Sequence, residues 1–200
     1  MAAIVVPFRG PDGKRRLEPL PEDARRELAL AMLGDVVAAC VAVGPTVVVT
    51  ADADGAALAE DLGGVAIEDP GDGQGGAVAA GLATVDGLPA LVVNADLPCA
   101  VPHDVRGLAA ATPPDGLALV QAEDGTTNAL ALSDPALFAP VYGPHSASRF
   151  RQRAADRGVD AVAAVIPSLA RDVDTLADLQ HLSAKVGPRT QTAMARLGLG

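Results

Sequence analysis

Leu91-Val-Val-Asn-Ala-Asp96-Leu-Pro98 is an apolar run that ends in a single carboxylate, and it decides how the fold is interpreted. A short continuous apolar run is typical of a strand that is buried on both faces of a parallel sheet. In a doubly wound sheet, ligands bind at the carboxyl ends of the strands. Asp96 is therefore well placed to hold a magnesium ion on the phosphates of a nucleotide, although aspartate is also a common turn or helix-capping residue.

Strand-like and helix-like segments alternate on both sides of this run. We expect strands at 3–8, 46–50, 65–68, 90–94, 117–121, 128–132 and 161–166. We expect helices at 21–42, 55–62, 77–84, 102–111, 146–157, 176–185 and 189–197, with 69–76 as a glycine-rich loop. This order predicts an α/β fold, a three-layer α/β/α sandwich around a mostly parallel, Rossmann-like sheet. No linker or repeat divides the chain, so residues 1–200 are expected to form one domain.

The composition narrows the classes of partner. The net charge of −10 argues against a general nucleic-acid binder. Cys40 and Cys99 lack metal-binding spacing and are expected to be reduced thiols. The N-terminus lacks the features of a signal peptide, and no apolar run reaches membrane-spanning length. These observations predict a cytoplasmic protein with no membrane or nucleic-acid partner.

Acidic and basic residues suggest a more specific chemistry. Asp172-Val-Asp174 follows the apolar run 161–166, and with Asp96 it supplies three carboxylates. Magnesium needs only a few carboxylates when phosphates provide its other ligands, so this set predicts a nucleotidyltransferase. Two basic clusters, 9–16 and 149–157, are either docking sites for anionic ligands or solvated surface.

The glycine-rich segment Gly71-Asp-Gly-Gln-Gly-Gly76 formally matches GxGxxG, and Asp96 follows it by twenty residues. That spacing is typical of a dinucleotide-binding unit, but the fingerprint normally follows the first strand of such a unit. A flexible loop facing a nucleotide and an ordinary surface turn both remain open. The chain contains neither a P-loop nor a GxSxG nucleophile elbow.

Longer motifs carry a family resemblance across nearly the whole chain. They are Asn94-Ala-Asp-Leu-Pro98, Gly125-Thr-Thr-Asn-Ala-Leu130, Tyr142-Gly-Pro-His-Ser146 and Asp172-Val-Asp-Thr-Leu-Ala-Asp-Leu179. In combination they resemble the guanylyltransferases of coenzyme F-420 biosynthesis, the CofC/FbiD family. The tail Val186-Gly-Pro-Arg-Thr190 is similar to that of actinobacterial members, which use phosphoenolpyruvate. Archaeal members are associated with 2-phospho-L-lactate.

The resemblance implies the nucleotide-diphospho-sugar transferase type of fold and a reaction between GTP and one of these acids. An oxygen of the acid's phosphate attacks the α-phosphorus of GTP, and pyrophosphate leaves. Because that oxygen is already ionised, the protein needs only to position the substrates and neutralise charge. The implied residues are Lys14, Arg16 and Asp96 for catalysis, Thr127, Asn128, Gly143 and Ser146 for the acid, Arg9 and Gly75 for the nucleotide, and Asp96, Asp172 and Asp174 for Mg²⁺.

The chain departs from the family pattern at two places. Gln74-Gly75 stands where members often carry Leu-Asn, and the basic loop is one residue shorter than usual. The sequence leaves open whether the protein forms a homodimer and whether it hands its product directly to the next enzyme of the pathway.

Three other functions remain as alternatives. Molybdopterin guanylyltransferases and sugar-phosphate enzymes share the basic loop but usually carry an LxGGxSxRMG run, which this chain lacks. A non-catalytic nucleotide-binding module is disfavoured by the intact set of carboxylates. A dinucleotide-dependent oxidoreductase is distinguished by whether NAD or GTP raises the melting temperature.

Overall fold

The elements of the fold follow the expected alternation. A computed structural model describes residues 2–10, 17, 19–85 and 89–199. Its strands are β1 (Ala3–Pro7), β2 (Thr46–Val49), β3 (Val65–Ile67), β4 (Ala90–Val93), β5 (Gly116–Gln121), β6 (Thr127–Leu132) and β7 (Asp160–Ala163). Its helices are α1 (Glu22–Val41), α2 (Ala53–Asp61), α3 (Gly73–Leu82), α4 (Pro102–Ala111), α5 (Ser146–Arg157), α6 (Leu176–Leu182) and α7 (Pro188–Arg196), with a 3-10 turn at Pro135–Leu137.

The described strands form one sheet in the order β3-β2-β1-β4-β6-β5-β7. Only β6 is reversed, and it pairs antiparallel with both β4 and β5. The predicted mostly parallel sheet is therefore confirmed. Because β6 is reversed, its first residues lie beside the carboxyl end of β4. Asn94 N–H donates to the carbonyl oxygen of Asn128 at 3.0 Å, which brings both strands' polar residues to one edge of the sheet.

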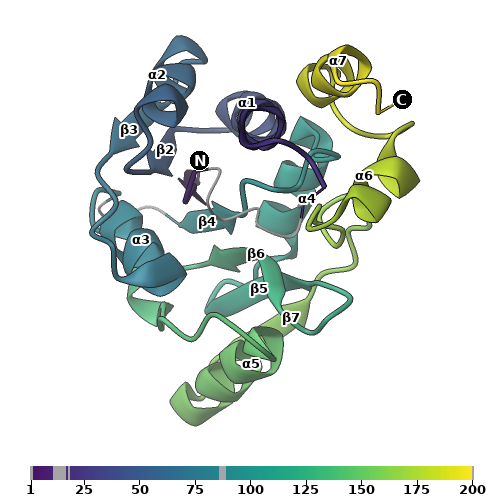
Figure 1. Cartoon of the computed structure of the whole chain (residues 1–200). Coiled ribbons are helices and arrows are strands. Elements are labelled where there is room, and N and C mark those ends of the chain that lie inside the picture. The colour runs from purple at the N-terminus through teal and green to yellow at the C-terminus, as the bar shows by residue number, and fades with distance from the viewer. Residues whose placement is uncertain (1, 11–16, 18, 86–88, 200) are drawn as a thin grey trace.

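Helices cover both faces of the sheet, as the three-layer prediction requires. The buried side chains of β1 alternate, with Ile4 and Val6 in one apolar cluster and Ala3 and Val5 in another. Helices α1, α2 and α4 pack against the first face, and α3 and α5 against the second (Figure 1). This burial of alternate residues on opposite faces explains why the strands are apolar almost throughout.

The C-terminal helices extend the layer that contains α1 (Figure 1). A third apolar cluster joins Met32 of α1 to Val173 and to Met194 of α7. The carboxylate of Asp35, which is only 5% exposed, accepts hydrogen bonds from the backbone N–H groups of Arg189 and Thr190 at 3.1 and 2.9 Å. It also accepts one from the hydroxyl of Thr190 at 2.7 Å. A carboxylate from α1 therefore caps the positive end of α7 and holds it in place.

The glycine-rich segment differs from the expected loop, because α3 begins at Gly73 rather than at residue 77. A β-carbon on Gly75 would lie 2.8 Å from Cβ of Pro140, so this turn of helix packs closely against a distant segment. Tertiary packing of this kind overrides the low helix propensity of glycine. The last strand is also shorter than expected, since β7 ends at Ala163.

The cysteines and the apolar helices bear on the expectations drawn from composition. Cys40 and Cys99 are free thiols, as predicted, and the structure shows that both are buried. Within the described ranges, no helix combines the length and the apolarity that crossing a bilayer requires.

Candidate functional site

Three aspartates from distant parts of the chain meet at one edge of the sheet. Asp96 lies just beyond β4, and Asp172 and Asp174 lie in the segment that leads into α6. One carboxylate oxygen from each of the three lies within 4.8 Å of those from the other two. All three side chains are partly buried, so this is a shielded group of negative charges rather than a solvated acidic surface. The structure thus brings together the three residues predicted as metal ligands.

Val173 explains how two of these carboxylates are held beside the third. Its side chain is fully buried in the cluster between α1, α6 and α7. Its backbone N–H donates to the carbonyl oxygen of Asp96 at 3.0 Å. Because Val173 is anchored both by its side chain and by its backbone, Asp172 and Asp174 on either side of it are directed toward Asp96.

The electrostatics of the site are those of crowded carboxylates. Burial raises the pKa of Asp172, and the neighbouring charge of Asp96 raises this pKa further. The amide of Asn128 acts in the opposite direction, because its Nδ2 donates to Oδ1 of Asp172 at 3.2 Å and stabilises the charged form. A cation at this position would relieve the repulsion between the three carboxylates.

The donor set fits a hard divalent cation. In the described part of the chain, the group consists of three carboxylate oxygens and includes no sulfur or imidazole ligand. Carboxylate oxygens are the ligands that Mg²⁺ prefers, whereas softer metals prefer sulfur or imidazole. Mg²⁺ keeps several ligands from water or phosphates, so three protein ligands are enough. The identity of the metal remains a prediction.

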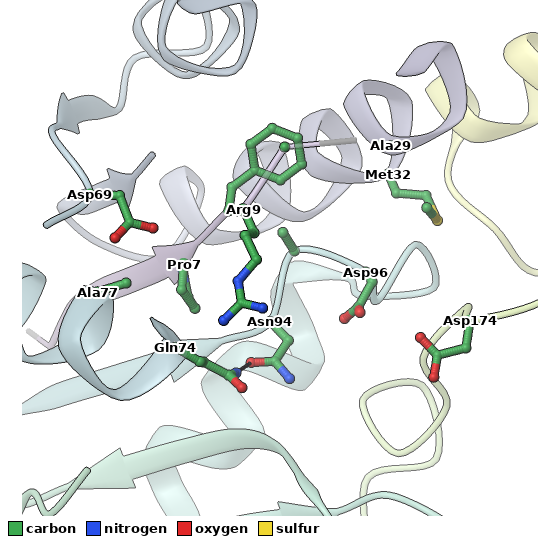
Figure 2. Close-up of a pocket in the computed structure, with 13 residues that line it drawn as sticks. Pro7, Arg9, Ala29, Met32, Asp69, Gln74, Ala77, Asn94, Asp96 and Asp174 are labelled. Atoms are coloured by element: carbon green, nitrogen blue, oxygen red, sulfur yellow. Dashed lines mark hydrogen bonds between the residues drawn. The ribbon is translucent and has the colours of Figure 1, made fainter. Parts of the chain in front are cut away.

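A pocket of about 250 Å³ opens beside the aspartates. It is lined by residues from the ends of β1 and β4, from the first turns of α3 and from α1, together with Asp96 and Asp174. Figure 2 places Arg9, Gln74 and Asn94 in its middle, with Asp69 on the side opposite Asp96 and Asp174. The position of the pocket matches the rule that doubly wound sheets bind ligands at the carboxyl ends of their strands.

Hydrogen bonds connect the pocket to the start of β6. Nε2 of Gln74 donates to Oδ1 of Asn94 at 2.8 Å, and Nδ2 of Asn94 donates to the carbonyl oxygen of Thr127 at 3.3 Å. The hydroxyl of Ser146 in turn donates to the hydroxyl of Thr127 at 3.0 Å. The side chains that line the pocket are therefore tied to the residues predicted to bind the acid.

The predicted acid-binding residues occupy the start of β6 and the turn before α5. Thr127 and Asn128 are 2% and 1% exposed, and Ser146 is fully buried. Gly143 has a φ of 106°, a conformation that glycine adopts far more readily than other residues. Because the hydroxyl of Ser146 points into the protein, this residue orders the turn, and its hydroxyl is not displayed to the pocket.

The structure describes two of the four predicted basic and nucleotide-binding residues, Arg9 and Gly75. Arg9 lines the pocket, and its Nη2 lies 3.5 Å from where a β-carbon on Gly73 would be. Gly75 instead packs against Pro140. Lys14 and Arg16 lie outside the described residues, so their predicted roles stay predictions.

Three pocket residues with polar or charged side chains were not among those predicted from the sequence, namely Asp69, Gln74 and Asn94. Asn94 could have been found, because it precedes Asp96 at the carboxyl end of the same strand. Asp69 and Gln74 offered a weaker signal, because the segment around them was interpreted as a glycine-rich loop that either faces a nucleotide or forms a surface turn.

The chain is similar in sequence to known guanylyltransferases along most of its length. Residues 2–192 match the family described as guanylyl transferase CofC like. A phosphoenolpyruvate guanylyltransferase from Streptomyces coelicolor is 38% identical, over 97% of this chain and 96% of the relative. One from Geodermatophilus obscurus is 36% identical, over 94% of this chain and 91% of the relative.

The fold has a similar counterpart among solved structures. A protein described as a nucleotide-diphospho-sugar transferase, from Desulfovibrio desulfuricans G20, superposes with a TM-score of 0.78 at 16% identity. The match covers 100% of this chain and 97% of that one. The predicted fold type is confirmed.

Proposed function

The chain belongs to the CofC-like guanylyltransferase family, and from that premise we propose that it is a phosphoenolpyruvate guanylyltransferase. It would join GTP to phosphoenolpyruvate, giving enolpyruvoyl-2-diphospho-5'-guanosine and pyrophosphate. The observation that carries this proposal is the convergence of Asp96, Asp172 and Asp174 beside a pocket, in a chain whose relatives bear that name. The place of the reaction in coenzyme F-420 biosynthesis, and in the cytoplasm, is part of the same proposal.

In the proposed reaction, the protein has to position the two substrates and neutralise the charge of the phosphates. A phosphate oxygen of the acid attacks the α-phosphorus of GTP, the bond to the β-phosphate oxygen breaks, and pyrophosphate leaves. The attacking oxygen is ionised at neutral pH, so no side chain has to remove a proton. Mg²⁺ held by the three aspartates would neutralise charge on the phosphates and orient them. Arg9, at the centre of the pocket, supplies a further positive charge toward the same phosphates.

The acid is proposed to bind near the start of β6 and the turn at Gly143. Thr127 and Ser146 bond to each other, so their hydroxyls hold the backbone of this region in shape. A site of this kind presents backbone donors to phosphate and carboxylate oxygens. Among the residues that the structure describes, this region has no group that recognises the double bond of phosphoenolpyruvate.

We therefore expect phosphoenolpyruvate to be preferred over 2-phospho-L-lactate by only a modest factor. The two acids carry similar charges and differ by two hydrogens and a planar carbon. Discrimination by shape alone is worth about 1–3 kcal/mol, or roughly 10–200-fold in kcat/KM. A preference for phospholactate would change the assigned acid and leave the guanylyl transfer intact.

The deciding experiment is a panel of GTP, ATP, CTP and UTP, each with phosphoenolpyruvate or 2-phospho-L-lactate and Mg²⁺. Release of pyrophosphate is followed, with the next enzyme of the pathway present because the free product is expected to be short-lived. We expect release to require GTP, an acid and Mg²⁺ together. The matched control is Asp96→Asn, which keeps the shape of the side chain and removes its charge. Full activity in that variant would contradict the metal-ligand role of Asp96. If the wild type released no pyrophosphate with any combination of nucleotide and acid, the proposed function would be contradicted.

A further inference from the structure

The pocket has two chemically different ends. Asp96 and Asp174 lie at one end, and Asp69 lies at the other with Pro7 and Ala77 beside it (Figure 2). The triphosphate of a nucleotide belongs at the first end, where a cation can bridge it to the clustered carboxylates. Among the described lining residues, Asp69 is the one carboxylate at the second end. A carboxylate that shares no cation with neighbouring carboxylates repels phosphate, so this end is suited to the base.

The second end combines a polar group with apolar walls. Pro7 and Ala77 contribute apolar lining at this end, Ala77 with only 2% of its surface exposed, while Asp69 is partly buried and lines the same space. Oδ1 of Asp69 accepts a hydrogen bond from the backbone N–H of Gly71 at 2.8 Å, which fixes the orientation of the carboxylate. A carboxylate has about four lone-pair sites, so both of its oxygens can accept further hydrogen bonds from a ligand.

Purine bases differ in what they present to such a group. Guanine carries two adjacent donors on one edge, the N1–H and the 2-amino group, and these match the two oxygens of a carboxylate. Adenine presents the lone pair of N1 on that edge, which a carboxylate repels. We propose that Asp69 selects guanine, by accepting hydrogen bonds from N1–H and the 2-amino group. This inference rests on the proposed function and names the residue that determines its choice of nucleotide.

The competing explanation is that Asp69 only stabilises its own turn. Asp134 provides a matched comparison, because its Oδ1 accepts a hydrogen bond from the backbone N–H of Ala136, also at 2.8 Å and also two residues ahead. Asp134 does not line the pocket. Asn in either place keeps a side-chain oxygen for the turn, since Asn and Asp form the same local hydrogen bond. Only at Asp69 should the lost charge alter the choice of base.

The test compares wild type, Asp69→Asn and Asp134→Asn with GTP, ITP, XTP and ATP. Inosine lacks the 2-amino group, and xanthosine carries a carbonyl oxygen in its place, which an Asn amide can donate to. Pyrophosphate release is measured with both acids supplied, so that the choice of acid does not enter. A hydrogen bond to a charged group is worth roughly 10- to 150-fold in affinity. We expect the wild type to prefer GTP over ITP by such a factor.

Asp69→Asn should lower kcat/KM for GTP and raise it for XTP, so that the ratio of XTP to GTP increases at least about a hundredfold over wild type. Asp134→Asn should leave the ratio unchanged. A gain with XTP also demonstrates that the variant is folded. Unaltered ratios in Asp69→Asn, with GTP still used by the wild type, would overturn the assignment of Asp69 and leave the guanylyl transfer standing. A wild type that uses none of the nucleotides would overturn both.

Discussion

Replacing Asp172 with Asn should stabilise the metal-free protein while removing its response to Mg²⁺. The substitution keeps an oxygen that can accept from the amide of Asn128, which lies 3.2 Å from Oδ1 of Asp172. It removes one of three negative charges whose oxygens lie within 4.8 Å of one another. The native carboxylate is therefore a net cost to the metal-free folded state, and a bound cation would offset it.

The size of this cost follows from the spacing of the charges. Two unit charges 4.8 Å apart repel by about 3.5 kcal/mol at an effective dielectric constant of 20. Partial exposure to solvent screens this repulsion, and the lost charge-assisted bond from Asn128 subtracts part of the gain. We expect the free energy of unfolding to rise by about 1–2 kcal/mol in the variant.

Urea denaturation in the presence of a chelator measures this difference. With a slope of roughly 2 kcal/mol per molar urea, the midpoint should rise by about 0.5–1 M. Asp115→Asn, at an exposed position outside the site, is the control for the general effect of lowering a net charge of −10. Mg²⁺ with GTP should then raise the midpoint of the wild type more than that of Asp172→Asn. A less stable variant in chelator, or an equal gain from Mg²⁺, would refute this reasoning.

The pH dependence gives the same effect a second measurement. A raised folded pKa means that the folded protein holds the Asp172 proton more tightly than the unfolded chain does. The cost is therefore complete above the raised pKa of the folded protein, and it is lost as the pH falls from that value to the unfolded value of about 3.9. The advantage of Asp172→Asn over wild type, in chelator, should shrink over that range.

Other substitutions test the remaining parts of the structure. Asp172→Ala and Asp174→Ala should each abolish most turnover, and the double variant should be little worse than the poorer single variant, because ligands of one metal act as a unit; multiplicative losses in kcat/KM would indicate separate roles. Asp35→Ala should lower the free energy of unfolding by about 2–4 kcal/mol in urea titrations, since three donors of α7 lose their acceptor, whereas a change below 1 kcal/mol would show that apolar contacts alone hold α7. Cys40 is fully buried and burial raises its pKa to about 12, so a thiol reagent should label it only after unfolding; rapid labelling of the native protein would contradict its burial.

Local patterns in the sequence were sufficient for most elements of the fold. The helix at 102–111 has the predicted bounds, because Pro102 favours the first helical turn and marks where the helix begins. The strand at 90–93 was recognisable because its residues are apolar on both faces. The start of α3 was missed, because the contact of Gly75 with Pro140 joins segments far apart in the chain and leaves no local signal.

The candidate site was predictable in its chemistry but not in its arrangement. Carboxylates that follow apolar strands are candidate metal ligands, so Asp96, Asp172 and Asp174 could be named from the sequence as a predicted metal site. Their meeting within 4.8 Å depends on the buried side chain of Val173 and on its backbone bond to Asp96. Nothing near either segment in the sequence specifies that contact.

The sequence by itself determined most of the strands and helices, apart from the start of α3, and which of them are followed by carboxylates, because periodicity and residue type are local properties. Only the tertiary structure decided which loops share one pocket. The reversed strand β6 brings Thr127 and Asn128 to the carboxyl end of β4, and the first turn of α3 sets Gln74 against Asn94. Strand order, strand direction and the packing of helices on the sheet are set by the burial of the whole core, so the placement of Asp69 opposite Asp96 and Asp174 follows from the fold and not from the residues around it.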